Sequence, residues 1–194
     1  MENTEKKFST KDIAILGILL AICIVSQFFK TLSIFITGPI INACLVFAVL
    51  LTNLPGAIVL CIITPITAFF IAQSPVTTAV PLVVPFIILG NIVLVVVTHF
   101  LVKKRMLSKD FKKDILNYVF ACAASLAKGV FMGLTISLWL LPSFIPQESP
   151  LRGKMPVFQT TFSLYQFLTA LIGFVYVFII WVFIGGRFSD LSEK

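Results

Sequence analysis

One charged side chain stands out in this chain, because Lys128 lies within the otherwise apolar stretch ACAASLAKGVFMGL. An ammonium group donates up to three hydrogen bonds and attracts an anion, so this lysine is a candidate for binding a negatively charged group. A lysine placed at the centre of a membrane helix costs about 2.5–3.5 kcal/mol. Other residues of the chain, or a ligand, must therefore stabilise the charge of Lys128.

Other polar residues occur in apolar stretches where they could meet the lysine. In FQTTFSLYQFLTALIG, Gln159 and Gln166 are seven residues apart, which places them near one face of a continuous helix. Such polar groups either bind a ligand or hydrogen-bond neighbouring helices to one another. With Lys128, the candidate substrate-binding residues are Asn42, Asn91, Ser125, Gln159, Phe162, Gln166 and Thr169.

Acidic partners for Lys128 are missing from the apolar stretches. All eight acidic residues lie in the termini or the loops, and Glu148 is the one that could reach inward at a suitable depth. One interpretation is a lysine that extends to the membrane surface or hydrogen-bonds polar side chains. The other is a lysine that lines an outward-facing cavity and meets the anionic or strongly polar end of a ligand.

The motifs of catalysis, metal binding and nucleotide binding are also missing. The sequence has no H-E-x-x-H motif, no intramembrane carboxylate pair and no phosphate-binding glycine loop, and His99 is its only histidine. We therefore expect no catalytic residue and no metal site. The four cysteines are scattered through apolar runs and are expected to be buried as free thiols.

Long apolar runs must position these side chains. Hydrophobic residues make up 59% of the 194 residues and charged residues only 12%. About 20 apolar residues in a helix cross a bilayer core, so the runs predict an all-α integral membrane protein, a bundle of six transmembrane helices in a single domain, 1–194. The expected spans are Ile13–Phe29, Ile34–Leu51, Pro55–Ala72, Val80–Val102, Ile115–Leu141 and Val157–Ile184.

The basic residues predict how the bundle lies in the membrane. If both termini are cytoplasmic, the inner segments carry eleven lysines and arginines and the outer loops carry three. Basic residues favour the cytoplasmic side, so we expect a multi-pass protein of the cell membrane with cytoplasmic N- and C-termini. Lys128 then falls in the outer half of the membrane. The basic run KKRMLSKDFKK is explained by this topology, and no nucleic-acid partner is expected.

Small residues lie on one face of the first apolar run, where DIAILGILLAICIV carries Ala14, Gly17 and Ala21. Small or polar residues also interrupt the apolar stretches TGPIINACLVFAVLL, VPFIILGNIVLVVV, SLAKGVFMG and YQFLTALIG. With these features, the whole chain resembles the substrate-binding S components of energy-coupling factor (ECF) transporters. The three small residues are similar to the family's A-x-x-x-A motif, with a glycine in place of the first alanine, and the four stretches resemble spans two, four, five and six of the vitamin-transporting branch.

The resemblance implies high-affinity binding and uptake of a vitamin or related small organic micronutrient. It implies a membrane T component that docks on Ala14, Gly17 and Ala21, and two ATPase subunits that use ATP, with no cofactor in this chain. The alternative function is a self-contained membrane facilitator or an accessory subunit of another complex. A separate alternative for the three small residues is ordinary packing inside the bundle.

The resemblance also implies where the ligand lies. In this family the outer ends of spans four to six bind the ligand, and the loops after spans one, three and five cover it. In this chain those loops correspond to about Lys30–Gly38, Gln73–Ala79 and Pro142–Pro156. The resemblance does not specify which micronutrient is bound.

Overall fold

The computed structural model describes residues 9–29, 33–107 and 114–192, and within these residues the chain is helical with no strand. An all-α bundle with six helices long and apolar enough to cross a membrane confirms the predicted fold class. The ends of these helices lie within a few residues of the expected ones. The spans are Thr10–Gln27, Ile34–Leu51, Leu54–Ile71, Val83–Met106, Ile115–Phe144 and Arg152–Ile184.

Several spans are divided into shorter helical elements. Segments η1 and η2 are π-helical and η3 is a 3-10 turn, so the last three spans are composite. In chain order the elements are α1 Thr10–Gln27, α2 Ile34–Leu51, α3 Leu54–Ile71, α4 Pro75–Ala79, α5 Val83–Val97, η1 Thr98–Lys103, α6 Lys104–Met106, α7 Ile115–Met132, η2 Gly133–Leu140, α8 Leu141–Phe144, η3 Arg152–Lys154, α9 Met155–Phe162 and α10 Leu164–Ser192.

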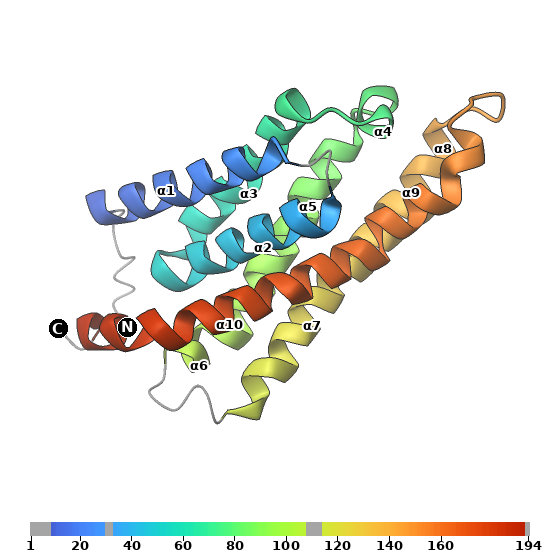
Figure 1. Cartoon of the computed structure of the whole chain (residues 1–194). Coiled ribbons are helices and arrows are strands. Elements are labelled where there is room, and N and C mark those ends of the chain that lie inside the picture. The colour runs from blue at the N-terminus through green and yellow to red at the C-terminus, as the bar shows by residue number, and fades with distance from the viewer. Residues whose placement is uncertain (1–8, 30–32, 108–113, 193–194) are drawn as a thin grey trace, which may run out of the picture.

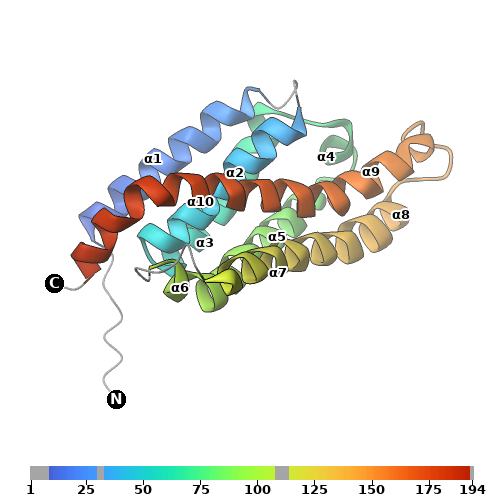
Figure 2. The same cartoon turned by 60° about the horizontal axis from the view of Figure 1, so that its bottom comes forward.

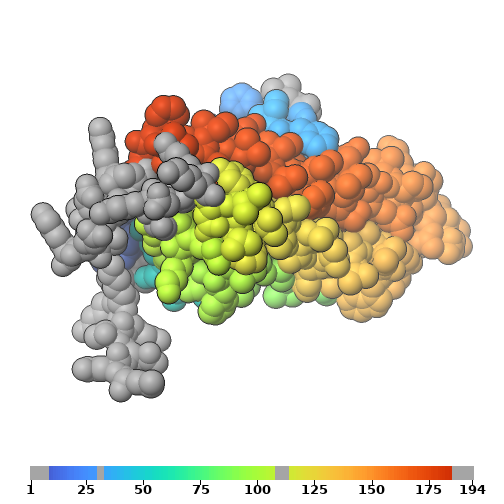
Figure 3. Space-filling view, turned by 90° about the horizontal axis from the view of Figure 1, so that it is seen from below, coloured from blue at the N-terminus to red at the C-terminus, as the bar shows by residue number. Residues whose placement is uncertain are grey.

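Helix α2 lies at the centre of the bundle. It contacts α1, α3, α5 and α10, and 61% of its residues are buried, more than in any other described span. Figures 1 and 2 show α1 and α10 on either side of α2. Helix α1 begins and α10 ends at one end of the bundle, whereas the turn between α8 and α9 lies at the other (Figure 1). Figure 3 shows α10 running alongside α7.

Polar side chains fix where several of the helices begin. Ser9 and Asp12 form a capping box at the start of α1, in which the Asp12 carboxylate accepts a hydrogen bond from the Ser9 N–H at 3.0 Å. Asn53 caps α3 by accepting a hydrogen bond from the Gly56 N–H at 2.9 Å. Each cap satisfies a backbone donor that the helix itself leaves unpaired. The apolar runs therefore begin as helices at defined residues.

The fourth span begins three residues later than predicted, at Val83 rather than Val80. The preceding segment forms the short helix α4, which the sequence did not predict, followed by a turn. Pro81 lies in this turn, and Pro85 lies in the first turn of α5, where a missing N–H costs no helical hydrogen bond. The two prolines therefore help to set where the span begins.

Two glycines let α10 approach its neighbours closely. A Cβ atom added at Gly173 would lie 2.9 Å from Asn42 Cβ and 3.0 Å from the Pro39 carbonyl oxygen on α2. A Cβ atom added at Gly129 of α7 would lie 2.7 Å from Phe167 Cβ on α10. Small residues at helix crossings permit the close packing that holds membrane helices together. Both crossings lie beside Lys128 or one of its partners.

Hydrogen bonds between polar groups join the helices at the end of the bundle where α1 begins. Arg105 donates a hydrogen bond to the Asp114 carboxylate at 2.8 Å, and this bond holds the pKa of the Asp114 carboxyl below its ordinary value. Trp181 of α10 donates to the Met106 carbonyl at 2.8 Å. Several basic residues behind the predicted orientation, among them Lys109, lie outside the described residues. The cytoplasmic position of the termini therefore stays a prediction.

Candidate functional site

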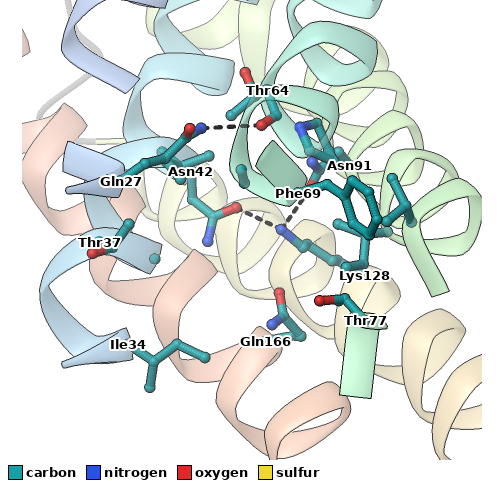
Figure 4. Close-up of a pocket in the computed structure, with 16 residues that line it drawn as sticks. Gln27, Ile34, Thr37, Asn42, Thr64, Phe69, Thr77, Asn91, Lys128 and Gln166 are labelled. Atoms are coloured by element: carbon teal, nitrogen blue, oxygen red, sulfur yellow. Dashed lines mark hydrogen bonds between the residues drawn. The ribbon is translucent and has the colours of Figure 1, made fainter. Parts of the chain in front are cut away.

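Lys128 lies inside the bundle, with 2% of its surface exposed. Its Nζ donates hydrogen bonds to Asn42 Oδ1 at 2.6 Å and to Asn91 Oδ1 at 2.7 Å (Figure 4). The lysine comes from α7 and the asparagines from α2 and α5, so one ammonium group joins three helices. Hydrogen bonds from a charged donor are about twice as strong as neutral ones, and these two offset part of the cost of burying the charge.

These contacts exclude a lysine that extends to the membrane surface, and they confirm the hydrogen bonds to polar side chains that the same interpretation allowed. Contact of the lysine with a ligand stays a prediction. The suggestion that Glu148 reaches inward to meet it is wrong, since Glu148 is exposed in the loop between α8 and α9. Among the described residues, Lys128 forms no ion pair. Its positive charge is therefore held by neutral groups.

A cavity of about 140 Å³ lies beside the ammonium group. This volume is close to that of an engineered cavity of about 150 Å³ that binds benzene. Besides Lys128 and its two asparagines, the polar side chains that line it are Gln27, Thr37, Thr64, Thr77 and Gln166. The larger apolar side chains that line it are Ile34, Ile41, Pro65, Phe69, Val84 and Ile87.

The cavity lies where the packing of apolar side chains changes. One buried cluster joins α1, α2, α3, α5, α7 and α10, and Ile41 packs against it. A second cluster joins α4, α5, η2, α8 and α9, and Ile87 packs against that one. The cavity is also lined by the end of α1 and the start of α10, so it occupies the half of the bundle away from the chain ends. The sequence predicts that this half faces outward.

The structure brings four of the predicted substrate-binding residues together at this cavity: Lys128, Asn42, Asn91 and Gln166. Thr169 does not line the cavity, but its Oγ1 accepts a hydrogen bond at 3.3 Å from Nδ2 of Asn42, which does. It therefore contacts a residue of the cavity without lining the cavity itself.

Ser125 does not line the cavity, although it lies on the same helix as Lys128. Its Oγ donates to the Ala121 carbonyl of its own helix at 2.9 Å, and its side chain is buried. A hydroxyl that bonds the carbonyl four residues earlier satisfies itself within the helix. Ser125 is therefore a packing residue in this structure.

Gln159 and Phe162 lie away from the cavity because the sixth span is broken at Ser163. Helix α9 ends before this residue and α10 begins after it, so the expected seven-residue face is not continuous. Gln159 Nε2 instead donates to the Ser137 carbonyl at 3.2 Å and ties α9 to η2. Phe162 belongs to the second apolar cluster. The prediction of one polar stripe along this span is wrong.

Gln27 is a cavity residue that the sequence reasoning missed. It is buried, and its Nε2 donates to the Thr64 carbonyl at 3.0 Å (Figure 4). The same Nε2 donates to Thr67 Oγ1 at 3.1 Å. Its Oε1 has no hydrogen-bond partner among the described residues. The sequence did offer a signal for Gln27, because an amide side chain lies at the outer end of the first apolar run. The same kind of signal identified Asn42.

Of the three loops expected to cover the ligand, two contribute to the cavity. Thr77 of α4 lines it from the segment 73–79, and Thr37 lines it from the described part of 30–38. No described residue of the segment 142–156 lines it. The short helix α4 therefore takes part in the cover, and the proline-rich loop does not.

The expected docking residues lie on the open face of α1. Ala14, Gly17 and Ala21 are all exposed, and a Cβ atom added at Gly17 would meet nothing within 4 Å. The alternative in which these small residues pack inside the bundle is therefore excluded. The face is continuous with a shallow groove lined by residues of α1 and α3, including Leu20 and Val59.

The fold and the site together define a multi-pass helical membrane protein with a charged cavity between its helices. Comparison of the chain with protein-family models, with curated proteins and with solved structures finds no match. In the described part of the chain, no three histidine, cysteine or acidic side chains gather as metal ligands. Cys23, Cys44 and Cys61 are buried free thiols, whereas Cys122 is an exposed one, contrary to expectation. The function must be argued from the cavity.

Proposed function

We propose that the chain binds a vitamin or related small organic micronutrient beside Lys128 and serves its uptake as the S component of an ECF-type transporter. The observation that carries the proposal is a buried ammonium group at a cavity, held by amides and without a described acidic partner. A buried charge is expensive in a membrane and commonly belongs to a substrate pathway. In the cell membrane, with cytoplasmic termini, this cavity would receive its ligand from outside.

Partner subunits would supply the energy for uptake. The sequence contains no nucleotide-binding loop, so the proposal assigns ATP hydrolysis to two separate ATPase subunits. The open face of Ala14, Gly17 and Ala21 supports docking of a membrane T component, since small residues let another helix approach closely. The chain itself would be a binding protein and not an enzyme. Recovery of such subunits by pull-down from native membranes tests this assignment against a self-contained facilitator.

Replacement of Lys128 by methionine is expected to weaken ligand binding about ten- to a hundredfold. A hydrogen bond from a charged donor is worth about 1.5–3 kcal/mol, which corresponds to this change in affinity. Mass spectrometry of ligand retained by the gently purified protein identifies the ligand, and calorimetric titration then compares the two affinities. Ser125→Ala, on the same helix but outside the cavity, is the matched control and should bind as the wild type does. Unchanged affinity in a folded Lys128→Met protein would contradict the ligand role.

Replacement of Gly17 by leucine is expected to leave ligand binding intact and to abolish uptake. The added side chain occupies open space on α1, so it disturbs no contact within the chain but prevents close approach of another helix. Binding to the purified protein and uptake by cells that contain the whole transporter are measured side by side. Ala123→Leu, a similar change at an exposed position of α7, is the control. Normal uptake by the Gly17→Leu protein would rule out docking at this face.

A further inference from the structure

The polar wall of the cavity offers donors that the protein itself does not use. An ammonium group has three N–H donors, and two of those on Lys128 are taken by Asn42 and Asn91. The third remains for a ligand. Asn91 is 3% exposed and accepts from the lysine through Oδ1, but its Nδ2 has no partner among the described residues. This Nδ2 does not belong to the fully buried side-chain atoms that lack a partner, so it is accessible from the cavity that Asn91 lines and can donate to a ligand there.

Gln166 adds a third donor that is only weakly engaged. Its Nε2 donates to the Thr161 carbonyl across the break between α9 and α10 at 3.4 Å. Hydrogen bonds of this type are normally 2.7–3.2 Å long, so a stronger acceptor in the cavity would displace the carbonyl. Lys128, Asn91 and Gln166 thus present donors from α7, α5 and α10 to one space.

An anion is the acceptor that this arrangement lacks. No aspartate or glutamate of the described residues lines the cavity, and the partners of the ammonium group are neutral amides. One carboxylate has two oxygens and accepts several hydrogen bonds, which suits one ammonium and two amide donors. It also balances a single positive charge. A phosphate dianion would leave a surplus negative charge in the membrane interior, where an unbalanced charge is expensive.

The size and the apolar lining of the cavity set the rest of the ligand. The volume of about 140 Å³ suits one six-membered ring. Phe69, Ile34 and Ile87 are among the apolar side chains that line it and would contact an uncharged ring. We infer that the cavity binds a small monocarboxylate, with its carboxylate on Lys128, Asn91 and Gln166 and an apolar or aromatic body about one ring in size. This inference rests on the proposed function and narrows its substrate class.

Matched pairs of ring carboxylates and their amides test the inference, because each pair differs by charge and hardly by shape. The full chain is purified in detergent, and binding of nicotinate, nicotinamide, benzoate and benzamide is measured by calorimetric titration and thermal shift. Each carboxylate is expected to bind about tenfold more tightly than its amide, or more tightly still. Phenyl phosphate is expected to bind more weakly than benzoate. Equal or tighter binding of the amides or of phenyl phosphate would overturn the inference, as would failure of both carboxylates to bind.

Two variants test whether Lys128 and Gln166 cause the preference for a carboxylate over its amide. Lys128→Met should remove the preference of the protein for the carboxylate of each pair, whereas Ser125→Ala should retain it. Gln166→Glu introduces a side chain of nearly the same shape as glutamine, and it tests the same preference if the Lys128→Met protein does not fold. Its added carboxylate would repel that of the ligand and occupy Lys128, so this protein should prefer the amides. A wild-type preference in either folded variant would contradict the assignment.

The binding measurements need neither the T component nor the ATPase subunits. Normal uptake by a protein that does not prefer carboxylates would therefore overturn the ligand class and leave the transporter function standing. A carboxylate preference in a chain that recovers no partner subunits and supports no uptake would overturn the transporter function and leave the ligand class standing.

Discussion

Replacement of Asn42 by leucine should lower the free energy of unfolding by about 2–4.5 kcal/mol. The change removes the hydrogen bond that Asn42 accepts from the buried ammonium of Lys128, worth about 1.5–3 kcal/mol. It also removes the hydrogen bond that Asn42 donates to Thr169, worth about 0.5–1.5 kcal/mol. Asn91→Leu removes only the bond to Lys128 and should cost less. Thermal unfolding of the purified proteins in one detergent gives the order of the two losses.

A second substitution should restore much of this stability. With Lys128→Met in the Asn42→Leu background, no charge is left without its partner, and replacing both members of a buried polar pair is often nearly neutral. The double variant should therefore unfold at a higher temperature than Asn42→Leu alone. The Ser125→Ala change added to the same background should give no recovery. A double variant that shows the sum of the two separate losses would contradict a direct bond.

Replacement of Gly173 by alanine should lower the free energy of unfolding by about 1–3 kcal/mol, the usual cost of overpacking. The added methyl group would lie 2.9 Å from Asn42 Cβ, 3.0 Å from the Pro39 carbonyl oxygen and 3.1 Å from the Ala43 nitrogen. Two of these atoms belong to the backbone of α2, so α10 must move away from α2 as a whole.

The position of Gly173 next to Asn42 extends this effect to the cavity. Movement of α10 would disturb the amide that holds Lys128, so ligand affinity should fall together with stability. Gly17→Ala, at a position with nothing within 4 Å, is the control and should change neither. Thermal unfolding and ligand titration of the same samples test both effects. A Gly173→Ala protein as stable as the wild type would show that the two helices are not in fixed contact.

The spans could be predicted from the sequence because they depend on the composition of continuous segments. A segment of about 20 consecutive apolar residues can cross the membrane because of its own composition, independently of the rest of the chain. The position of Lys128 along the fifth span followed similarly, since it depends on where one residue lies within one run. Whether its side chain faces the bundle interior did not follow, because that depends on the neighbouring helices.

The partners of Lys128 could not be predicted in the same way. Asn42 and Asn91 lie 86 and 37 residues from the lysine in sequence, and their contact depends on how three helices pack. The sequence identified all three as polar residues in apolar runs, but it did not pair them and offered Glu148 as the one acidic residue that could reach the lysine. The amides meet the lysine because α2 lies at the centre of the bundle, which no single run reveals.

The break at Ser163 was missed because no proline or glycine occupies that position. The Ser163 Oγ donates to the Gln159 carbonyl at 2.6 Å, an alternative that the serine side chain offers to the backbone. Gly133 of the π-helical segment η2 packs against the same serine, where an added Cβ atom would lie 3.1 Å away. The break thus coincides with a close contact between two spans, and only the packed structure separates Gln159 from the cavity.

In the proposed transport cycle, the ammonium group held by two neutral amides would couple movement of the chain to the membrane voltage. Moving one elementary charge across a membrane potential of 100 mV involves about 2.3 kcal/mol of electrical work. When the cavity is empty, any movement of Lys128 along the membrane normal does part of this work, because its charge has no described acidic partner. A bound monocarboxylate cancels the charge. In the proposed transport cycle, the membrane potential would therefore act on the charge of Lys128 in the empty protein and not on the neutral pair that Lys128 forms with the ligand.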